Sequence, residues 1–223
     1  MPGGPGSLTD PLAPDGARAR PDRARASLDR VDSDVVPALH PLLAARWSPT
    51  HFDTAHQASD AEVACLLEAA RWAPSAGNSQ PWAFLVGRRG DAVHRRLVRH
   101  LAGSSAVWAP SASVLVANLS HRYVEDTGWE YSEFSLYDLG QAVAHMTLQA
   151  QALGLSGRQF RAFRRAELAA EFDVPDHWEV TTLTAFGRPR QDPGTPQPPA
   201  SAPRDRRAVE HLAWPAARSA SAR

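Results

Sequence analysis

The longest regular pattern in the sequence is a stripe of mostly apolar side chains that runs at helical spacing from about Leu136 to Leu153. The stripe consists of Leu139, Val143, Met146, Thr147, Ala150 and Leu153. Residues three and four positions apart share one face of an α-helix, so the pattern predicts a long helix with one buried face. Gly154 follows at once and is suited to end this helix, because glycine adopts the left-handed backbone of a C-cap without strain.

The segments around this helix predict a mixed fold with few strands. Apolar runs predict short strands at residues 82–87 (WAFLVG) and 113–119 (SVLVANL). A third strand is predicted at residues 178–186 (WEVTTLTAF), which mix apolar and Thr positions. A capping box of Ser59 and Glu62 predicts the start of a further helix, which ends before Pro74. Other helices are predicted after a cap at Asp91, at about residues 164–172, and in the apolar segment 36–45. Few strands, a long central helix and a trailing arm favour an α+β fold over a doubly wound sheet.

The two ends of the chain differ in composition from its middle. Of the 223 residues 43% are hydrophobic, which suffices for one domain with a core, and we place that domain at residues 36–190. Residues 1–35 are rich in Pro, Gly, Ala, Arg and Asp and are expected to be a disordered extension, because they cannot bury enough apolar surface to offset their ordering entropy. Residues 191–214 are expected to form a Pro-rich connector and an arm, and residues 215–223 a disordered tail.

Charge and cysteine content narrow the classes of partner and chemistry. The 24 basic and 24 acidic residues cancel, so no net field favours nucleic acid or an anionic membrane. Every basic residue is Arg, which excludes a Lys Schiff base and a P-loop Lys. Cys65 is the only cysteine, and the histidines show no metal-ligand spacing, so we expect neither a disulfide nor a metal site.

The sequence also indicates where in the cell the protein is expected. No apolar run approaches the roughly 20 residues that a membrane helix needs. The first residues, MPGGPGSLTDPLAPDG, lack the cationic and then apolar order of a signal peptide. We therefore expect a cytoplasmic protein without a membrane partner.

The stretch that says most about function is residues 73–82, APSAGNSQPW, between a predicted helix and a predicted strand. Two prolines stiffen it, and Gly77 permits close approach of the backbone to a ligand. Ser75, Asn78 and Gln80 offer hydrogen-bond donors and acceptors. An ordinary connector also contains turn residues, but this combination favours a shaped binding loop.

Two further stretches carry candidate anion contacts. Arg46 and Ser48 follow the apolar segment 36–45, and a guanidinium paired with a hydroxyl suits a phosphate dianion, although most such arginines face solvent. The cluster RDRR at 204–207 precedes Leu212 and Trp214. That apolar content favours an arm that docks on another surface and carries its Arg residues with it, over a solvated charge cluster on a tail.

These stretches together resemble the nitroreductase family. APSAGNSQPWAFLV (73–86) resembles a family loop that is usually close to APSxxNxQPWxFxV, and RWSPTHF (46–52) is similar to the family's N-terminal phosphate motif. LYDLGQAVAHMTLQAQALGL (136–155) resembles its central dimer helix. TLTAFGRP (182–189) and RRAVEHLAW (206–214) resemble its last core strand and its C-terminal arm, so the family's order is kept over about residues 37–214.

The resemblance implies a nitroreductase-like fold, with an antiparallel-type central sheet flanked by helices, in an intertwined homodimer with an extended C-terminal arm. It also implies bound FMN. Phosphate contacts would come from the 46–52 motif and the 204–207 cluster, flavin contacts from the 73–82 loop of the opposite subunit, and backbone near the reactive flavin nitrogen from the segment GLSGRQFRAF (154–163). The implied FMN-binding residues are Arg46, Ser48, Thr50, Pro74, Ser75, Asn78, Gln80, Gln159, Arg161, Ala162, Arg206 and Arg207.

The sequence departs from the family pattern at two of these positions. Thr50 stands where the family usually carries a second basic residue, which bears on the strength of phosphate binding. Arg161 replaces a glycine next to the flavin. It either adds a positive charge that stabilises reduced flavin or points away to solvent.

The implied activity is ping-pong hydride transfer from NADH or NADPH through FMN to a nitroaromatic, quinone or activated alkene, with no catalytic side chain, since the flavin performs the chemistry. Alternatives are oxidation of a peptide-derived or other natural product with oxygen as acceptor, flavin storage without turnover, and a structural dimer without cofactor. Trp129, Tyr131 and Phe134 either stack an aromatic acceptor or pack beneath a loop.

Overall fold

The structure is a computed structural model that describes residues 39–190 and 206–214. The chain divides into two compact units, Leu39–Pro203 and Met1–Ala38 with Arg204–Arg223. The predictions for residues 1–35, for the Pro-rich connector and for residues 215–223 lie outside the described residues.

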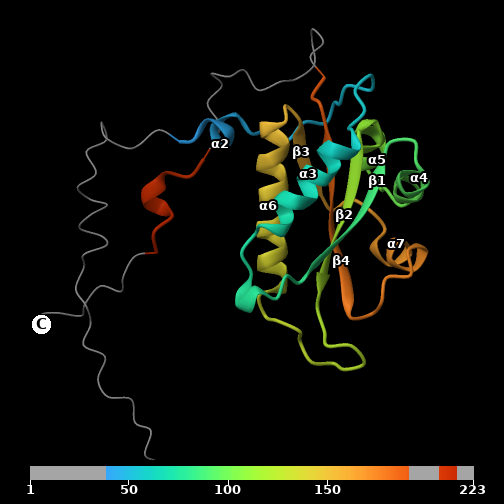
Figure 1. Ribbon diagram of the computed structural model, residues 1–223, viewed down its shortest axis with the longest axis vertical. Helices are drawn as coiled ribbons and strands as arrows, with labels where there is room; N and C mark the ends of the chain where they lie inside the picture. Colours follow the sequence, from blue (N-terminus) through green and yellow to red (C-terminus); the bar gives the residue numbers. More distant parts are fainter. Residues whose placement is uncertain (1–38, 191–205, 215–223) are drawn as a thin grey trace, which may run out of the picture. The chain divides into compact units, whose positions relative to one another are not determined.

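A four-stranded antiparallel sheet organises the larger unit (Figure 1). Its strands are β1 (Trp82–Arg88), β2 (Val114–His121), β3 (Ser156–Phe160) and β4 (Trp178–Gly187), in the spatial order β1-β2-β4-β3. β2 has a strand on each side and a helical layer on each face, and every one of its residues except His121 is buried. This explains why its sequence is continuously apolar instead of alternating. The expected α+β class with an antiparallel central sheet is confirmed.

Alternate residues of β2 enter two separate cores. Val114 and Val116 pack with Leu139 and Met146 of α6 (Ser135–Ala152), beside α3 (Asp60–Arg71). Leu115 and Ala117 belong to the other core, under α4 (Ala92–Arg99), α5 (Ser105–Trp108) and α7 (Arg165–Glu171). Figure 1 shows α3 and α6 on one side of the sheet and α4 and α7 on the other. The sheet is thus the middle layer between two sets of helices.

The predicted helix boundaries rest on local hydrogen bonds that the structure contains. The capping box at α3 is complete, because Ser59 N donates to Glu62 Oε2 at 2.7 Å and Glu62 N donates to Ser59 Oγ at 3.2 Å. Asp91 Oδ1 accepts the His94 amide at 2.6 Å and caps α4. Gly154, with φ +73°, follows the C-cap of α6 in the left-handed conformation.

Some elements differ from the sequence-based expectation. The apolar segment 36–45 forms only a short helix, α2 (Pro41–Ala45), within the described residues. The strand β3 was not predicted. Its sequence, SGRQF, has polar side chains at its centre, which an edge strand tolerates because one side of it faces no further strand in the described sheet.

The described part of the smaller unit is residues 206–214. It contains one turn of 3-10 helix, η4 (Val209–His211). Val209, Leu212 and Trp214 are exposed, with 95% of the Trp214 surface accessible. None of the described helices in either unit is long and apolar enough to cross a membrane.

Candidate functional site

The first part of the site is the segment that follows α2. Arg46 Nη1 donates to Ser48 Oγ at 3.2 Å, so the structure brings the two predicted phosphate contacts together. Phe52, 2% exposed, anchors the end of this segment in the core and pairs with Pro189 after β4. Thr50 is half-buried, and its hydroxyl lies 3.1 Å from His51 Nδ1. The segment is therefore held at both ends and presents a guanidinium and a hydroxyl side by side.

A second guanidinium reaches the same segment from β3. Arg158 Nη1 donates to the backbone carbonyl of Ser48 at 2.7 Å, and its guanidinium lies over the ring of Trp108, 5.3 Å from the centroid. Arg158 was not among the predicted site residues, although it adjoins Gln159. Sequence gave no signal for this contact, because 110 positions separate the two residues and only the unpredicted strand β3 brings them together.

The second part of the site is the loop between α3 and β1. It contains the 3-10 turn η2 (Ala76–Asn78) and three residues in the left-handed region, Gly77, Asn78 and Gln80, with φ of 60°, 55° and 47°. The Gln80 amide donates to Ser75 Oγ at 3.0 Å, and Gln80 Nε2 lies 3.3 Å from Asn78 Oδ1. Left-handed backbone at two non-glycine residues is uncommon and costs energy, so the loop is a fixed, shaped structure as expected.

This loop rests on the first turn of α6. Asp138, 2% exposed, accepts the Ala76 amide at 3.0 Å through Oδ2. A pocket of about 250 Å³ opens where the loop meets the helix. Its lining consists of Pro74, Ser75, Ala76, Phe134, Tyr137, Asp138 and Gln141. Two predicted loop residues and one predicted substrate contact thus share a pocket.

The loop and β3 contact α6 at different levels. The loop meets the helix at Asp138, whereas Gln159 of β3 donates to Thr147 Oγ1 at 2.8 Å. Nine positions of helix separate Asp138 from Thr147, which corresponds to roughly 13 Å along the axis at about 1.5 Å per residue. The loop and Gln159 therefore lie at different levels of this helix.

The segment after β3 is exposed at the remaining predicted positions. Gln159, Arg161 and Ala162 are all accessible. The guanidinium of Arg161 lies over the ring of Phe163, 5.4 Å from its centroid. The Ala162 carbonyl accepts the Ala102 amide at 3.0 Å, which fixes the backbone here. In the smaller unit, Arg207 Nη2 donates to the His211 carbonyl at 3.1 Å, and Arg206 is exposed.

The three aromatic candidates between β2 and α6 have different surroundings. The ring of Tyr131 stacks on His121 at 3.8 Å, and His121 stacks in turn on Trp178 at 4.7 Å. Burial and the nearby His177 hold the pKa of His121 below its ordinary value, which favours the neutral ring. Trp129 is 78% exposed, and Phe134 lines the pocket described above. Tyr131 therefore packs, while Trp129 and Phe134 are available to a ligand.

A model of the nitroreductase family, described as "Nitroreductase family", matches residues 43–117. That span contains the Arg46–Ser48 segment, the loop with its left-handed residues, β1 and the first part of β2. Residues 43–117 are thus similar to the nitroreductase family. The expected nitroreductase-like fold is confirmed, because solved nitroreductase structures superpose on the chain over most of their length.

Several relatives share this fold or sequence. A protein of Archaeoglobus fulgidus whose name includes "NADH dehydrogenase/NAD(P)H nitroreductase" is 28% identical over 141 residues, which cover 61% of this chain and 77% of the relative. A Streptomyces coelicolor protein with the same words in its name is 27% identical over 183 residues, covering 74% and 89%. A Desulfovibrio desulfuricans nitroreductase solved "in complex with fmn" is 26% identical, with a TM-score of 0.64 and coverage of 80% and 98%.

One other structure described as an "oxidoreductase containing FMN" is 28% identical, with a TM-score of 0.64 over 69% of this chain and 78% of that one. A Clostridium difficile nitroreductase-family structure, 20% identical, has a TM-score of 0.61 over 78% and 95%. The likeness therefore extends well beyond the residues that the family model matches.

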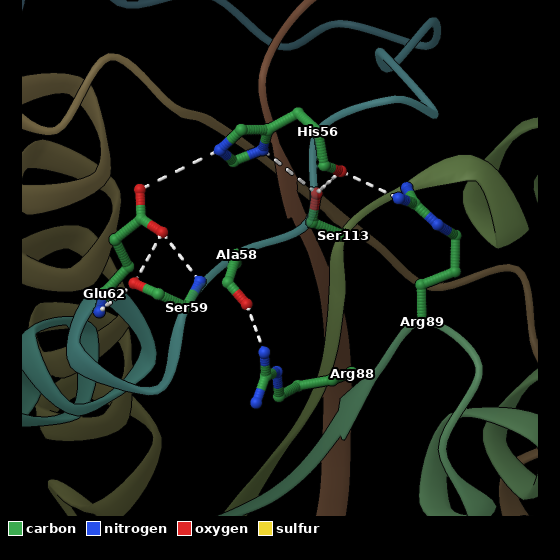
Figure 2. A network of polar contacts seen from close by, with 7 residues as sticks. All are labelled: His56, Ala58, Ser59, Glu62, Arg88, Arg89 and Ser113. Carbon is green, nitrogen blue, oxygen red and sulfur yellow. Dashed lines mark hydrogen bonds and ion pairs between the residues drawn. The ribbon is translucent and has the colours of Figure 1, made fainter.

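A serine, a histidine and a glutamate also lie in a row, where His56 stands between Glu62 of α3 and Ser113 at the start of β2 (Figure 2). His56 Nδ1 lies 3.3 Å from Ser113 Oγ, and His56 Nε2 lies 3.9 Å from Glu62 Oε1. Ser113 is fully buried, and its hydroxyl donates to the His56 carbonyl at 2.8 Å. Arg89 donates to the same carbonyl at 2.7 Å. The row ties the segment before α3 to the start of β2 and presents no accessible nucleophile.

Proposed function

We propose that this chain is an FMN-dependent NAD(P)H oxidoreductase that acts on a small oxidised acceptor, such as a nitroaromatic, a quinone or an activated alkene. The observation that carries the proposal is the Arg46–Ser48 pair at the start of a domain whose relatives are named NAD(P)H nitroreductases and whose structural neighbours contain FMN. When bound, the flavin would supply the redox chemistry itself, taking hydride from NAD(P)H and giving it to the acceptor.

The donor groups present fit a flavin nucleotide. A phosphate dianion is recognised by guanidinium and hydroxyl donors, and Arg46 with Ser48 supplies both within one hydrogen bond of each other. The ring of a flavin carries carbonyl oxygens and ring nitrogens along one edge. The side-chain amides of Asn78 and Gln80, exposed on a rigid loop, can donate to such groups. Arg46, Ser48, Asn78 and Gln80 are thus the residues that would hold FMN.

We also propose a homodimer, in which the loop and the Arg46–Ser48 group are two half-sites and a second copy of the chain completes each site. An apolar groove of about 370 Å³ between α2, α3 and α6 supports such an assembly. Trp72 in its wall is 72% exposed in the single chain, and exposed apolar surface of this kind is typical of an interface.

The acceptor would enter over the aromatic residues that precede α6. Trp129 is the most exposed of these, and Phe134 lies in the wall of the loop pocket. Aromatic side chains stack planar acceptors in offset geometry, which suits nitroaromatics and quinones. Tyr131 contributes indirectly, because its ring is stacked on His121 and its hydroxyl lies 3.4 Å from the Ser79 carbonyl of the loop.

The decisive experiment is a visible spectrum of the protein purified without added cofactor, before and after anaerobic addition of NADPH or NADH. A flavin spectrum that bleaches supports the proposed activity and leaves only the acceptor to identify. A flavin spectrum that persists contradicts the reductase and favours an oxidase acting on a natural product or a flavin-storage protein. No flavin binding, even after incubation with FMN, contradicts every flavin-based function.

A further inference from the structure

Two guanidinium groups from distant parts of the chain converge on Ser48. Arg46 donates to its hydroxyl at 3.2 Å, and Arg158 donates to its carbonyl at 2.7 Å. Two guanidinium groups beside one hydroxyl present several N–H donors to the same place, and such donors suit the oxygens of an anion. The convergence therefore favours an anion beside Ser48.

Arg158 carries a charge that has no acidic partner among the residues that the structure describes. Within residues 39–190 and 206–214, no carboxylate lies within ion-pair distance of its guanidinium. Arg96 and Arg122, which are also half-buried, differ in this respect, since Arg96 pairs with Glu171 and Arg122 pairs with Glu179. The Trp108 ring stabilises the cation by a cation–π interaction, which attracts the charge without cancelling it.

The guanidinium of Arg158 is also held in place before any ligand binds. β3 directs Arg158 and Phe160 to one face of the sheet, where Phe160 packs edge-on against Trp108 with ring centroids 5.0 Å apart. Trp108 in turn contacts Phe52, 6.3 Å away, at the end of the Arg46–Ser48 segment. A guanidinium fixed by packing loses less rotamer freedom on binding, so its contribution to affinity is larger.

We infer that Arg158 binds the phosphate of the flavin nucleotide together with Arg46 and Ser48, and supplies the positive charge that the neutral Thr50 lacks. An arginine has five N–H donors, and the bond to the Ser48 carbonyl uses one of those on Nη1. The remaining donors can meet phosphate oxygens in the planar, bidentate manner that suits guanidinium. The inference rests on the proposed function and assigns a phosphate contact to a residue outside the motif that led to that proposal.

The test compares FMN with riboflavin, which has the same ring and no phosphate. Flavin-free protein carrying Arg158→Gln would be titrated with each, and binding followed by quenching of flavin fluorescence. We expect FMN to bind roughly 10- to 100-fold more weakly than to the unaltered protein, in line with the loss of a charged hydrogen bond, while riboflavin affinity changes less than about twofold. Arg95→Gln, an exposed arginine of α4, is the matched control and should leave both affinities unchanged.

A second variant makes the test independent of riboflavin. If Arg158 replaces the charge that is missing at position 50, Thr50→Arg in the Arg158→Gln background should restore at least about tenfold of the lost FMN affinity. The inference is overturned if Arg158→Gln leaves FMN affinity unchanged, or if it weakens FMN and riboflavin equally with a lowered melting temperature, since that result marks a purely structural role. Failure of the unaltered protein to bind either flavin would instead overturn the proposed function.

Discussion

The carboxylate of Asp138, buried in the first turn of α6, accepts the backbone N–H of Ala76 at 3.0 Å. This bond connects α6, the longest described helix, to the loop that carries the candidate flavin contacts. Inside the loop, Gly77, Asn78 and Gln80 hold left-handed backbone. Because this hydrogen bond ties the loop to the buried start of the helix, Asp138 stabilises the left-handed conformation of the loop.

Asp138→Ala should therefore loosen the loop and weaken flavin binding together. Removing the acceptor leaves the Ala76 amide without its partner, which costs about 1–3 kcal/mol when such a group stays away from water. Asp138→Asn keeps an oxygen at the same place and should cost less. Urea denaturation gives the stability change, and an FMN titration gives the affinity. Full flavin affinity in a destabilised Asp138→Ala variant would contradict the positioning role.

Asn78→Ala should weaken FMN retention and leave the oligomeric state unchanged, because the lost group is an exposed amide of the loop and not part of the apolar groove. Alanine also fits poorly at φ 55°, which adds a backbone cost of about 1 kcal/mol. Asn78→Gly removes the same amide without that strain. The flavin content of the purified variants, with size-exclusion chromatography, separates the two causes. Full flavin retention by Asn78→Gly would exclude an amide contact.

The sequence was informative where structure is set by neighbours along the chain. The capping box at Ser59, the cap at Asp91 and the helix end at Gly154 depend on residues close together in the sequence, and their residue types are typical of helix ends. The strands β1 and β2 were predictable from their apolar runs, and β4 from its mixture of apolar and β-branched residues. The loop at 73–82 was marked by turn residues that few other conformations require.

Features that depend on long-range pairing were missed for a physical reason. The strand β3 has the sequence SGRQF, and only its pairing with β4 makes it a strand. The Arg158–Ser48 contact joins residues 110 positions apart, and the Asp138–Ala76 contact joins residues 62 apart. Nothing in either local sequence encodes its partner. Such contacts arise only once the sheet and helices are assembled, so the half-sites emerged from the structure.

The α3 capping box should make stability depend on acid pH. The backbone N–H of Ser59 is the main cause that holds the pKa of Glu62 below its ordinary value of 4.5, with the Ser59 hydroxyl and the nearby His56 and Arg188 acting in the same direction against burial. A carboxyl with a lowered folded-state pKa contributes stability above its unfolded pKa, and that contribution is lost as pH falls through the folded value.

Glu62→Gln is the variant that isolates this effect, because glutamine keeps a hydrogen-bond acceptor for Ser59 and cannot ionise. At pH 7 we expect it to be less stable than the unaltered protein by no more than about 1 kcal/mol. The difference should shrink as the pH falls below about 4.5, where the glutamate itself becomes neutral. Melting temperatures between pH 3 and pH 7 provide the measurement. A constant difference across that range would show that the charge of Glu62 has no part in the cap.

Gly87→Ala should destabilise the protein strongly, because β1 approaches α4 backbone to backbone at this residue. A Cβ at position 87 would lie 2.5 Å from the His94 nitrogen and 2.6 Å from its Cα, closer than van der Waals contact allows. The helix cannot retreat easily, since the same His94 nitrogen donates to Asp91 at 2.6 Å and His94 is buried. Forcing extra volume into such a packed contact typically costs about 1–3 kcal/mol.

Gly128→Ala, in an exposed loop with open space around it, is the matched control and should stay within about 0.5 kcal/mol of the unaltered protein in urea denaturation. Equal stability of the two variants would mean that α4 can shift away from β1, and the cap at Asp91 would then not fix the start of that helix.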